Sequence, residues 1–142
     1  MKLVDLNLLL YAYNSTAREH KDATAWLSDL FAGRETIGLP WVTLLGFLRI
    51  ATSPKILANP RDLEQATVIV SDWLSRSNVS IVSPTDRHWQ ILSGLLPKHH
   101  IRGSLITDAH LAALAIENGA TLCTNDRDFL RFPGLKVEFP LQ

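Results

Sequence analysis

The sequence contains a single cysteine, Cys123, among its 142 residues. An internal disulfide is therefore impossible, and a zinc site built from cysteines would need a second chain. We expect this thiol to pack inside a strand. The sequence also lacks an apolar stretch of the roughly 20 residues that a helix needs to cross a bilayer. These shortages exclude a disulfide-stapled fold and indicate that the chain does not cross a membrane.

An excess of basic residues is also missing, because Lys and Arg number 14 and Asp and Glu number 14. Dedicated nucleic-acid binders usually carry a basic surface, so any contact with nucleic acid must be local or assisted by a partner. The best local candidate is PKHHIRG, residues 97–103, in which Arg102 is a possible substrate-binding residue. A solvated loop is an equally good interpretation of this segment.

The N-terminal residues lack the features of a secretory signal. The first apolar run is interrupted by Asp5 and Asn7, and neither a basic leader nor a small-residue cleavage site accompanies it. We therefore expect a cytoplasmic protein. A hydrophobic fraction of 46% and a charged fraction of 20% are typical of a globular chain, and the length predicts one domain over residues 1–142.

Short apolar runs alternate with helical patterns along the chain, which predicts a parallel sheet covered by helices on both faces. The expected fold is a three-layer α/β/α domain with a central sheet of about five strands. The expected strands are residues 2–5, 36–40, 79–82, 120–123 and 135–139. The expected helices are residues 6–13, 19–31, 41–52, 61–74, 84–96 and 104–118, with a short helix around 127–130.

Three aspartates, Asp5, Asp108 and Asp126, each lie where an apolar run meets a turn or a helix start. The carboxyl ends of parallel strands meet at one edge of a sheet, so residues a hundred positions apart can lie together there. Carboxylates brought together repel one another, and a cation relieves that repulsion. This pattern predicts a metal site.

Helix capping is the alternative role for each of these acids. Asp5 or Asn7 could accept a first-turn N–H, worth about 1 kcal/mol, and for Asp5 alone this interpretation is the stronger one. Asp108 borders the apolar stripe of its helix, where an unpartnered carboxylate is costly, but the helix dipole also favours it there. Asp126 is preferred as a ligand over Asp128, although the two could exchange roles.

The candidate ligands are hard oxygen donors, which suit Mg²⁺ or Mn²⁺ better than zinc. No His-x-x-x-His pair exists, and His110 should face away from Asp108 as a surface residue. A divalent ion held in this way can polarise a phosphodiester and lower the pKa of a bound water. Hydrolysis of a phosphodiester is therefore the expected reaction.

Four segments carry a resemblance to a known family, namely LVDLNLLLYA, PWVTLLGFLRIAT, TDAHLAALAIENGATLCTNDRDF and FPGLKV. They resemble PIN-domain ribonucleases, specifically the VapC toxins of type II toxin–antitoxin systems. The resemblance implies a PIN-like α/β/α fold and cleavage of RNA (tRNA, rRNA or mRNA) with Mg²⁺ or Mn²⁺, which inhibits translation. It also implies a VapB-type antitoxin that inserts a segment near the active site, and a homodimer formed through helices.

The resemblance also assigns roles to individual residues. Asp5 matches the first acid of the family pattern, Asp108 the third and Asp126 the fourth. Asn7 and Thr124 match supporting positions, and Asp128 is a further supporting candidate.

One acid of the family pattern is absent. Many members have Glu in a Thr-x-x-Glu-x-x-Arg motif, but here Thr43 is followed by Gly46 at the Glu position and by Arg49. A weaker site that fills mainly when RNA is bound is one hypothesis, and one or two metals remain possible. Asp22 or Glu19 could substitute for the missing acid. Arg49 could contact phosphate or form a salt bridge with a site carboxylate.

Two other functions are compatible with part of this pattern. A phosphatase with Asp5 as nucleophile would need a lysine near a later strand end, and none occurs between Lys98 and Lys136. A non-enzymatic module that binds an antitoxin or RNA could have lost activity together with the acid at position 46. Cleavage of RNA by the purified protein would separate these possibilities.

Overall fold

The structure, a computed structural model, describes residues 1–96 and 102–142. Five strands form one sheet in the order β3-β2-β1-β4-β5, and every neighbouring pair is parallel. The strands are β1 (Lys2–Val4), β2 (Ile37–Pro40), β3 (Val79–Val82), β4 (Thr121–Cys123) and β5 (Lys136–Glu138). The predicted central parallel sheet is confirmed.

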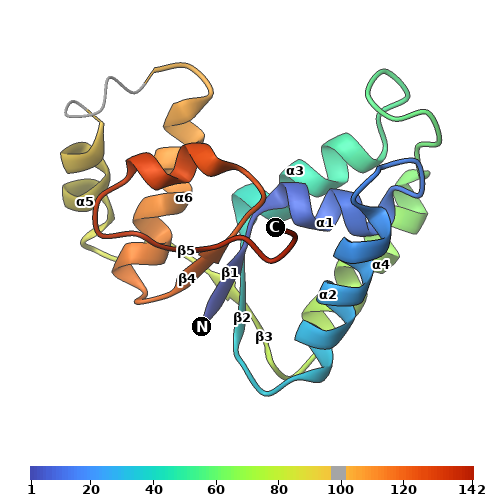
Figure 1. Ribbon diagram of the computed structural model, residues 1–142, viewed down its shortest axis with the longest axis horizontal. Helices are drawn as coiled ribbons and strands as arrows, with labels where there is room; N and C mark the ends of the chain where they lie inside the picture. The colour runs from blue at the N-terminus through green and yellow to red at the C-terminus, as the bar shows by residue number, and fades with distance from the viewer. Residues whose placement is uncertain (97–101) are drawn as a thin grey trace.

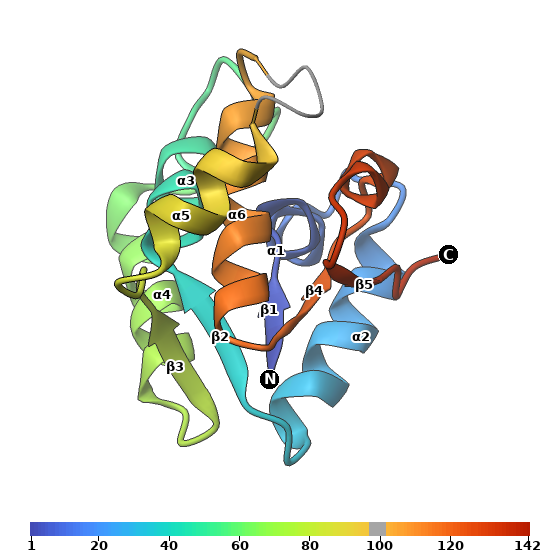
Figure 2. The same ribbon diagram turned by 90° about the vertical axis from the view of Figure 1, so that its left-hand side faces the viewer.

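Helices cover both faces of this sheet, as Figures 1 and 2 show. One face packs against α1 (Leu6–Tyr13), α2 (His20–Ala32), α3 (Trp41–Ala51) and α4 (Leu63–Ser75). The other face packs against α5 (His88–Leu95), α6 (Leu105–Glu117) and the 3₁₀ helix η2 (Arg127–Arg131). Successive side chains of a strand point to opposite faces, so Val4 joins the first core and Leu3 the second.

The strand order explains why the candidate site residues lie at one edge of the sheet. The chain builds outward from β1 through β2 to β3, and then returns to the other side of β1 to form β4 and β5. Parallel α/β sheets bind ligands beyond the carboxyl ends of the strands at such a switch point. The residues that follow β1 and β4 therefore meet at this edge, and the backbone N–H of Asp5 donates to the carbonyl of Cys123 (2.9 Å).

Two helices begin at least two residues later than the sequence pattern predicts. α4 begins at Leu63 instead of residue 61, because Asp62 and Gln65 form a reciprocal capping box. α5 begins at His88 instead of residue 84, because the backbone N–H of Thr85 donates to Oε1 of Glu117 (2.9 Å). A local capping box thus fixes the start of α4, and a long-range contact fixes the start of α5.

Several smaller expectations have clear outcomes. Cys123 is fully buried in β4, as expected. In the part of the chain that the structure describes, no helix is long and apolar enough to cross a membrane. Most of the basic segment PKHHIRG, residues 97–101, lies outside the described residues.

Three aromatic side chains join α1, α3 and α4 in the first core. The rings of Phe47 and Trp73 lie 4.6 Å apart between centroids, and each meets the ring of Tyr13 edge to face. The indole N–H of the fully buried Trp73 donates to the Tyr13 hydroxyl (3.0 Å). Tyr13 therefore satisfies a polar group that has no access to water.

We predict that Tyr13→Phe destabilises the protein by about 1–3 kcal/mol, because it leaves the Trp73 N–H buried and unpaired. Urea unfolding followed by tryptophan fluorescence would measure the loss. Tyr11→Phe on the same helix is the matched control and should change the unfolding free energy by less than about 0.5 kcal/mol. Equal losses in both variants would contradict the proposed role of the hydroxyl.

Candidate functional site

Asp5 follows β1 directly and is the N-cap residue of α1. Its Oδ1 accepts from the backbone N–H of Leu6 (2.7 Å), and its Oδ2 accepts from the hydroxyl of Thr124 (2.6 Å). Burial raises the pKa of Asp5, while these two hydrogen bonds oppose the rise. Capping and a site role are thus compatible, because one oxygen caps the helix and the other is held at the end of β4.

Thr124 connects the two loops that follow β1 and β4. Its fully buried hydroxyl donates to Asp5 and accepts from the backbone N–H of Asp126 (3.0 Å) and from Nδ2 of Asn7 (3.4 Å). Oδ1 of Asn7 in turn accepts from the backbone N–H of Asn125 (3.3 Å). These contacts give Asn7 and Thr124 a supporting position beside the acids.

Asp108 lies in the first turn of α6 and is half-buried. Its pKa is raised to about 6, first by burial and then by the negative charges of Asp5, Asp126 and Asp128. The structure therefore brings all four carboxylates into one region, although more than a hundred positions separate the first from the others. Their mutual repulsion is the condition that a bound cation would relieve.

The acids do not all face the same space. Asp5 and Asp108 line a cavity of about 120 Å³, which Leu6, Val42, Thr43, Thr107 and Leu111 complete. Oδ1 of Asp126 accepts from the backbone N–H of Asp128 (2.9 Å) and caps η2. Within residues 1–96 and 102–142, no three His, Cys, Asp or Glu side chains are grouped closely enough to hold a metal ion.

A divalent cation fits the pair Asp5 and Asp108. Mg²⁺ is commonly held by one or two carboxylates, with water and substrate phosphates at its other positions. The cavity between these two residues supplies that donor set, and its further oxygen-bearing residues are the threonines Thr43 and Thr107. The placement of Asp126 as a third ligand of the same ion stays a prediction.

Gly46, the position of the missing acid, packs against the first turn of α1. A Cβ atom added to Gly46 would lie 2.7 Å from Cδ2 of Leu6, closer than real Cβ contacts allow. The Leu6 side chain thus fills the space into which a larger residue at position 46 would project. The apolar side chain of Leu6 therefore lies where the family's glutamate side chain would start.

The candidate substitutes for that acid lie elsewhere. Glu19 and Asp22, at the start of α2, line a different cavity of about 360 Å³ with Asn125. Their charges are not among those that shift the pKa of Asp5 or Asp108. The structure thus gives no support to either residue as a replacement.

Arg131 is the cation whose charge lowers the pKa of Asp108, and its role was not evident from the sequence. Its guanidinium lies 3.7 Å from Oδ1 of Asp128 and opposes the rise in the pKa of Asp108. The spacing of three residues between Asp128 and Arg131 was the available signal. Arg49 and Arg102 are exposed, and within the described part of the chain neither forms a salt bridge. The expected alternative in which Arg49 pairs with a carboxylate of the site therefore lacks support.

The expectation that His110 lies on the surface is wrong. His110 is half-buried, with Nδ1 2.9 Å from Nε2 of His88, and Nδ1 of His88 lies 2.9 Å from Oε2 of the buried Glu117. Burial and the neighbouring His88 lower the pKa of His110. This chain of contacts fastens α5 to α6 on the side away from the first core.

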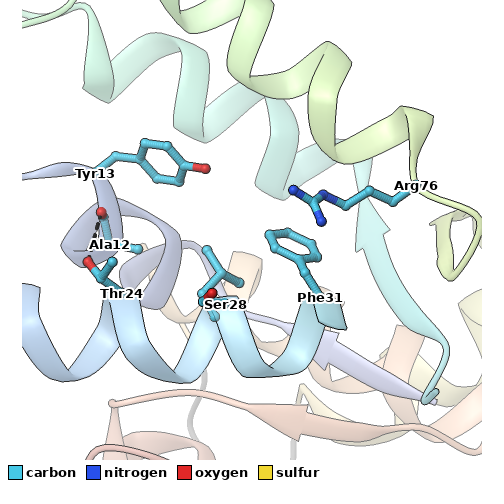
Figure 3. Close-up of a pocket in the computed structure, with 7 residues that line it drawn as sticks. Ala12, Tyr13, Thr24, Ser28, Phe31 and Arg76 are labelled. Carbon is cyan, nitrogen blue, oxygen red and sulfur yellow. Dashed lines mark hydrogen bonds between the residues drawn. The ribbon is translucent and has the colours of Figure 1, made fainter. Parts of the chain in front are cut away.

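A separate cavity of about 230 Å³ lies between α1, α2 and the end of α4 (Figure 3). The guanidinium of Arg76 lies over the ring of Phe31, 4.4 Å from its centroid, and Thr24 donates to the Ala12 carbonyl (3.2 Å). None of the candidate acids lines this cavity. It is therefore a surface distinct from the acidic site.

The comparisons with known proteins agree with this fold. The family model described as "PIN domain" matches residues 2–135, so the chain belongs to the PIN domain family. Within that family it belongs to the VapC group, because ribonuclease VapC37 of Mycobacterium tuberculosis is 41% identical over 99% of this chain and 97% of that protein. Ribonuclease VapC33 of the same species is 43% identical over 100% of this chain and 99% of its own length.

Solved structures show the same fold at lower identity. VapBC2 from Rickettsia felis, bound to a fragment of promoter DNA, matches with a TM-score of 0.71 and 22% identity over 96% of each chain. VapC20 of Mycobacterium tuberculosis, described as a sarcin–ricin loop cleaving toxin, has a TM-score of 0.66 and 15% identity over 96% of this chain and 99% of its own. The three-layer PIN architecture is thus confirmed.

The raised pKa of Asp108 predicts a specific pH dependence. The folded chain holds this proton more tightly than the unfolded chain, whose carboxyl has the ordinary pKa of 3.8, so stability falls as pH rises from about 4 to about 6. In a chelator, Asp108→Asn should therefore raise the melting temperature at about pH 7.5 by a few degrees, and should change it less at about pH 4.5.

Thermal unfolding by circular dichroism at the two pH values would measure this effect. Asp29→Asn, which changes an exposed carboxylate on α2, is the matched control and should leave the pH dependence unaltered. A lower melting temperature for Asp108→Asn at about pH 7.5 would show that the carboxylates of the site do not repel one another in the folded chain.

Proposed function

We propose that this protein is a ribonuclease that uses Mg²⁺ or Mn²⁺ to hydrolyse phosphodiester bonds in RNA, and that it is the toxin of a toxin–antitoxin pair. One observation carries the proposal. In a chain 41–43% identical to VapC ribonucleases, Asp5 and Asp108 line a common cavity at the switch point of the sheet. Cleavage of tRNA, rRNA or mRNA would inhibit translation, and the proposed location is the cytoplasm.

Each residue of the site has a distinct part in this proposal. Asp5 and Asp108 would hold the ion, which polarises the phosphodiester when bound, and Asp126 would contribute a further negative charge. Thr124 keeps the Asp5 carboxylate in one orientation by donating to its Oδ2. A carboxylate held in this way need not reorganise when the ion arrives, which favours binding.

Contacts to RNA are proposed for exposed cations. Arg49, in the last turn of α3, and Arg102, shortly before α6, have guanidinium groups accessible to phosphate. The protein has zero net charge, so such local contacts would have to supply the electrostatic part of binding. Asp128 and Arg131 form an ion pair, which would support the loop after β4 beside the candidate ligands.

We predict that the purified protein cleaves a broad RNA pool with Mg²⁺ or Mn²⁺ and that Asp5→Asn lowers the rate by at least about a hundredfold. The amide keeps the size of the side chain but removes the charge that holds the ion. Gel analysis of RNA fragments and circular dichroism of both proteins would measure cleavage and folding. Asp29→Asn should cleave at the wild-type rate.

The same assay separates the alternatives. Equal inertness of the wild type and Asp5→Asn on every RNA would favour a binding module that has lost activity. A covalent acyl-phosphate on Asp5 would instead revive the phosphatase, although both carboxylate oxygens of Asp5 already accept hydrogen bonds.

We propose a VapB-type antitoxin as the partner. The support is that the chain is 41–43% identical to VapC ribonucleases and that the VapBC2 structure of Rickettsia felis is a complex of this kind. We also propose a homodimer formed through helices. Trp41 and Leu45, four positions apart on α3, are 51% and 58% exposed and offer an apolar surface for this contact.

We predict that induction of the protein alone arrests growth, and that co-expression of a small protein encoded directly upstream relieves the arrest. The two proteins should then co-purify on a tag carried by only one of them. Light scattering of the separated toxin would give its oligomeric state. Failure of the upstream protein to bind would contradict this choice of partner and would leave the ribonuclease proposal standing.

A further inference from the structure

Thr43 is a buried polar residue in the cavity that Asp5 and Asp108 line. It lies in the first turn of α3 and is only 2% exposed. Within the described residues, its hydroxyl makes no hydrogen bond. Three other threonines show the usual alternative, because the hydroxyls of Thr24, Thr52 and Thr67 each donate to the carbonyl four residues earlier, at 2.6–2.7 Å.

An unpaired hydroxyl costs folding free energy when it is removed from water. Buried polar groups in proteins are nearly always paired, so each exception needs a reason. At functional sites the reason is commonly that the group meets a ligand, and stability is lost until that ligand binds. Thr43 shares its cavity with the carboxylates of Asp5 and Asp108, and a cation is the ligand that suits a space lined by two carboxylates and a hydroxyl.

The packing of α3 explains why Thr43 is the residue in question. Thr43 and Gly46 are three positions apart and therefore lie on the same face of the helix. The Leu6 side chain occupies the space beside Gly46, because an added Cβ would meet its Cδ2 at 2.7 Å. With an apolar side chain beside Gly46, Thr43 is the oxygen-bearing residue that α3 contributes to the cavity.

We propose that Thr43 is a neutral oxygen ligand for the divalent cation held by Asp5 and Asp108, and that α3 contributes this hydroxyl where other members of the family contribute a carboxylate. This inference rests on the proposed function. A neutral oxygen joins two carboxylates, so the ion keeps more net positive charge toward the RNA phosphate than in a site with a further acid. Hard oxygen donors of this kind suit Mg²⁺ and Mn²⁺.

The test is a comparison of Thr43→Val with Thr43→Ser. Valine has nearly the shape of threonine and lacks the hydroxyl, whereas serine keeps it. We expect Thr43→Val to weaken Mn²⁺ binding by about tenfold, as the loss of a group around a metal typically does, and Thr43→Ser to bind within about threefold of wild type. Titration without RNA, followed by the paramagnetic resonance signal of free Mn²⁺, measures affinity independently of cleavage.

Stability without metal gives a second readout of opposite sign. Removal of an unpaired buried hydroxyl should raise the melting temperature of Thr43→Val in a chelator, although the same change weakens the binding of Mn²⁺. Thr67→Val on α4 is the matched control, because it loses a hydroxyl that donates to the Leu63 carbonyl (2.7 Å). That control should not gain stability, and it should bind Mn²⁺ as wild type does.

Two outcomes would overturn the inference and can be distinguished from failure of the proposed function. If the wild type binds Mn²⁺, Asp108→Asn does not, and Thr43→Val binds as well as wild type, the role of Thr43 is wrong and the metal site stands. A lower melting temperature for Thr43→Val in a chelator would likewise assign the hydroxyl a structural hydrogen bond. If the wild type binds no Mn²⁺, the proposed function itself fails.

Discussion

The hydrogen bond from Thr124 to Asp5 joins the ends of two neighbouring strands, and the site depends on it. A buried carboxylate is unfavourable, and Asp5 is accommodated because one oxygen caps α1 while the other accepts from Thr124. The same hydroxyl accepts from Asp126 and Asn7, so a single buried threonine positions both loops. The parallel pairing of β1 with β4 brings these loops together in the first place.

The carboxylates of the site also repel one another. The carboxylate of Asp108 carries a pKa of about 6 beside three other acids, and Arg131 offsets only part of their charge. Folding therefore gathers negative charge that the described protein atoms do not neutralise. In a chain of the PIN domain family, this arrangement is the physical basis of the divalent-metal chemistry that we propose for the cavity between β1, α3 and α6.

Elements whose boundaries are set by local chemistry were predicted well. α1 and α3 begin where the pattern places them, since Asp5 caps the first helix and Pro40 precedes the second. Long-range contacts account for the larger errors. α5 begins late because Glu117 binds the backbone of residue 85, and His110 is half-buried because His88 reaches it from another helix. Neither contact leaves a periodic signal in the sequence.

The sequence by itself determined the alternation of strands and helices and the placement of acids at strand ends, because periodicity and strand termini are local properties. It did not determine which oxygens face a common space. That outcome depends on the packing of Leu6 against Gly46, on the burial of Thr43 beside Asp5, and on the use of Asp126 as a cap. Residues about forty positions apart meet there, and only the tertiary structure sets their distance and burial.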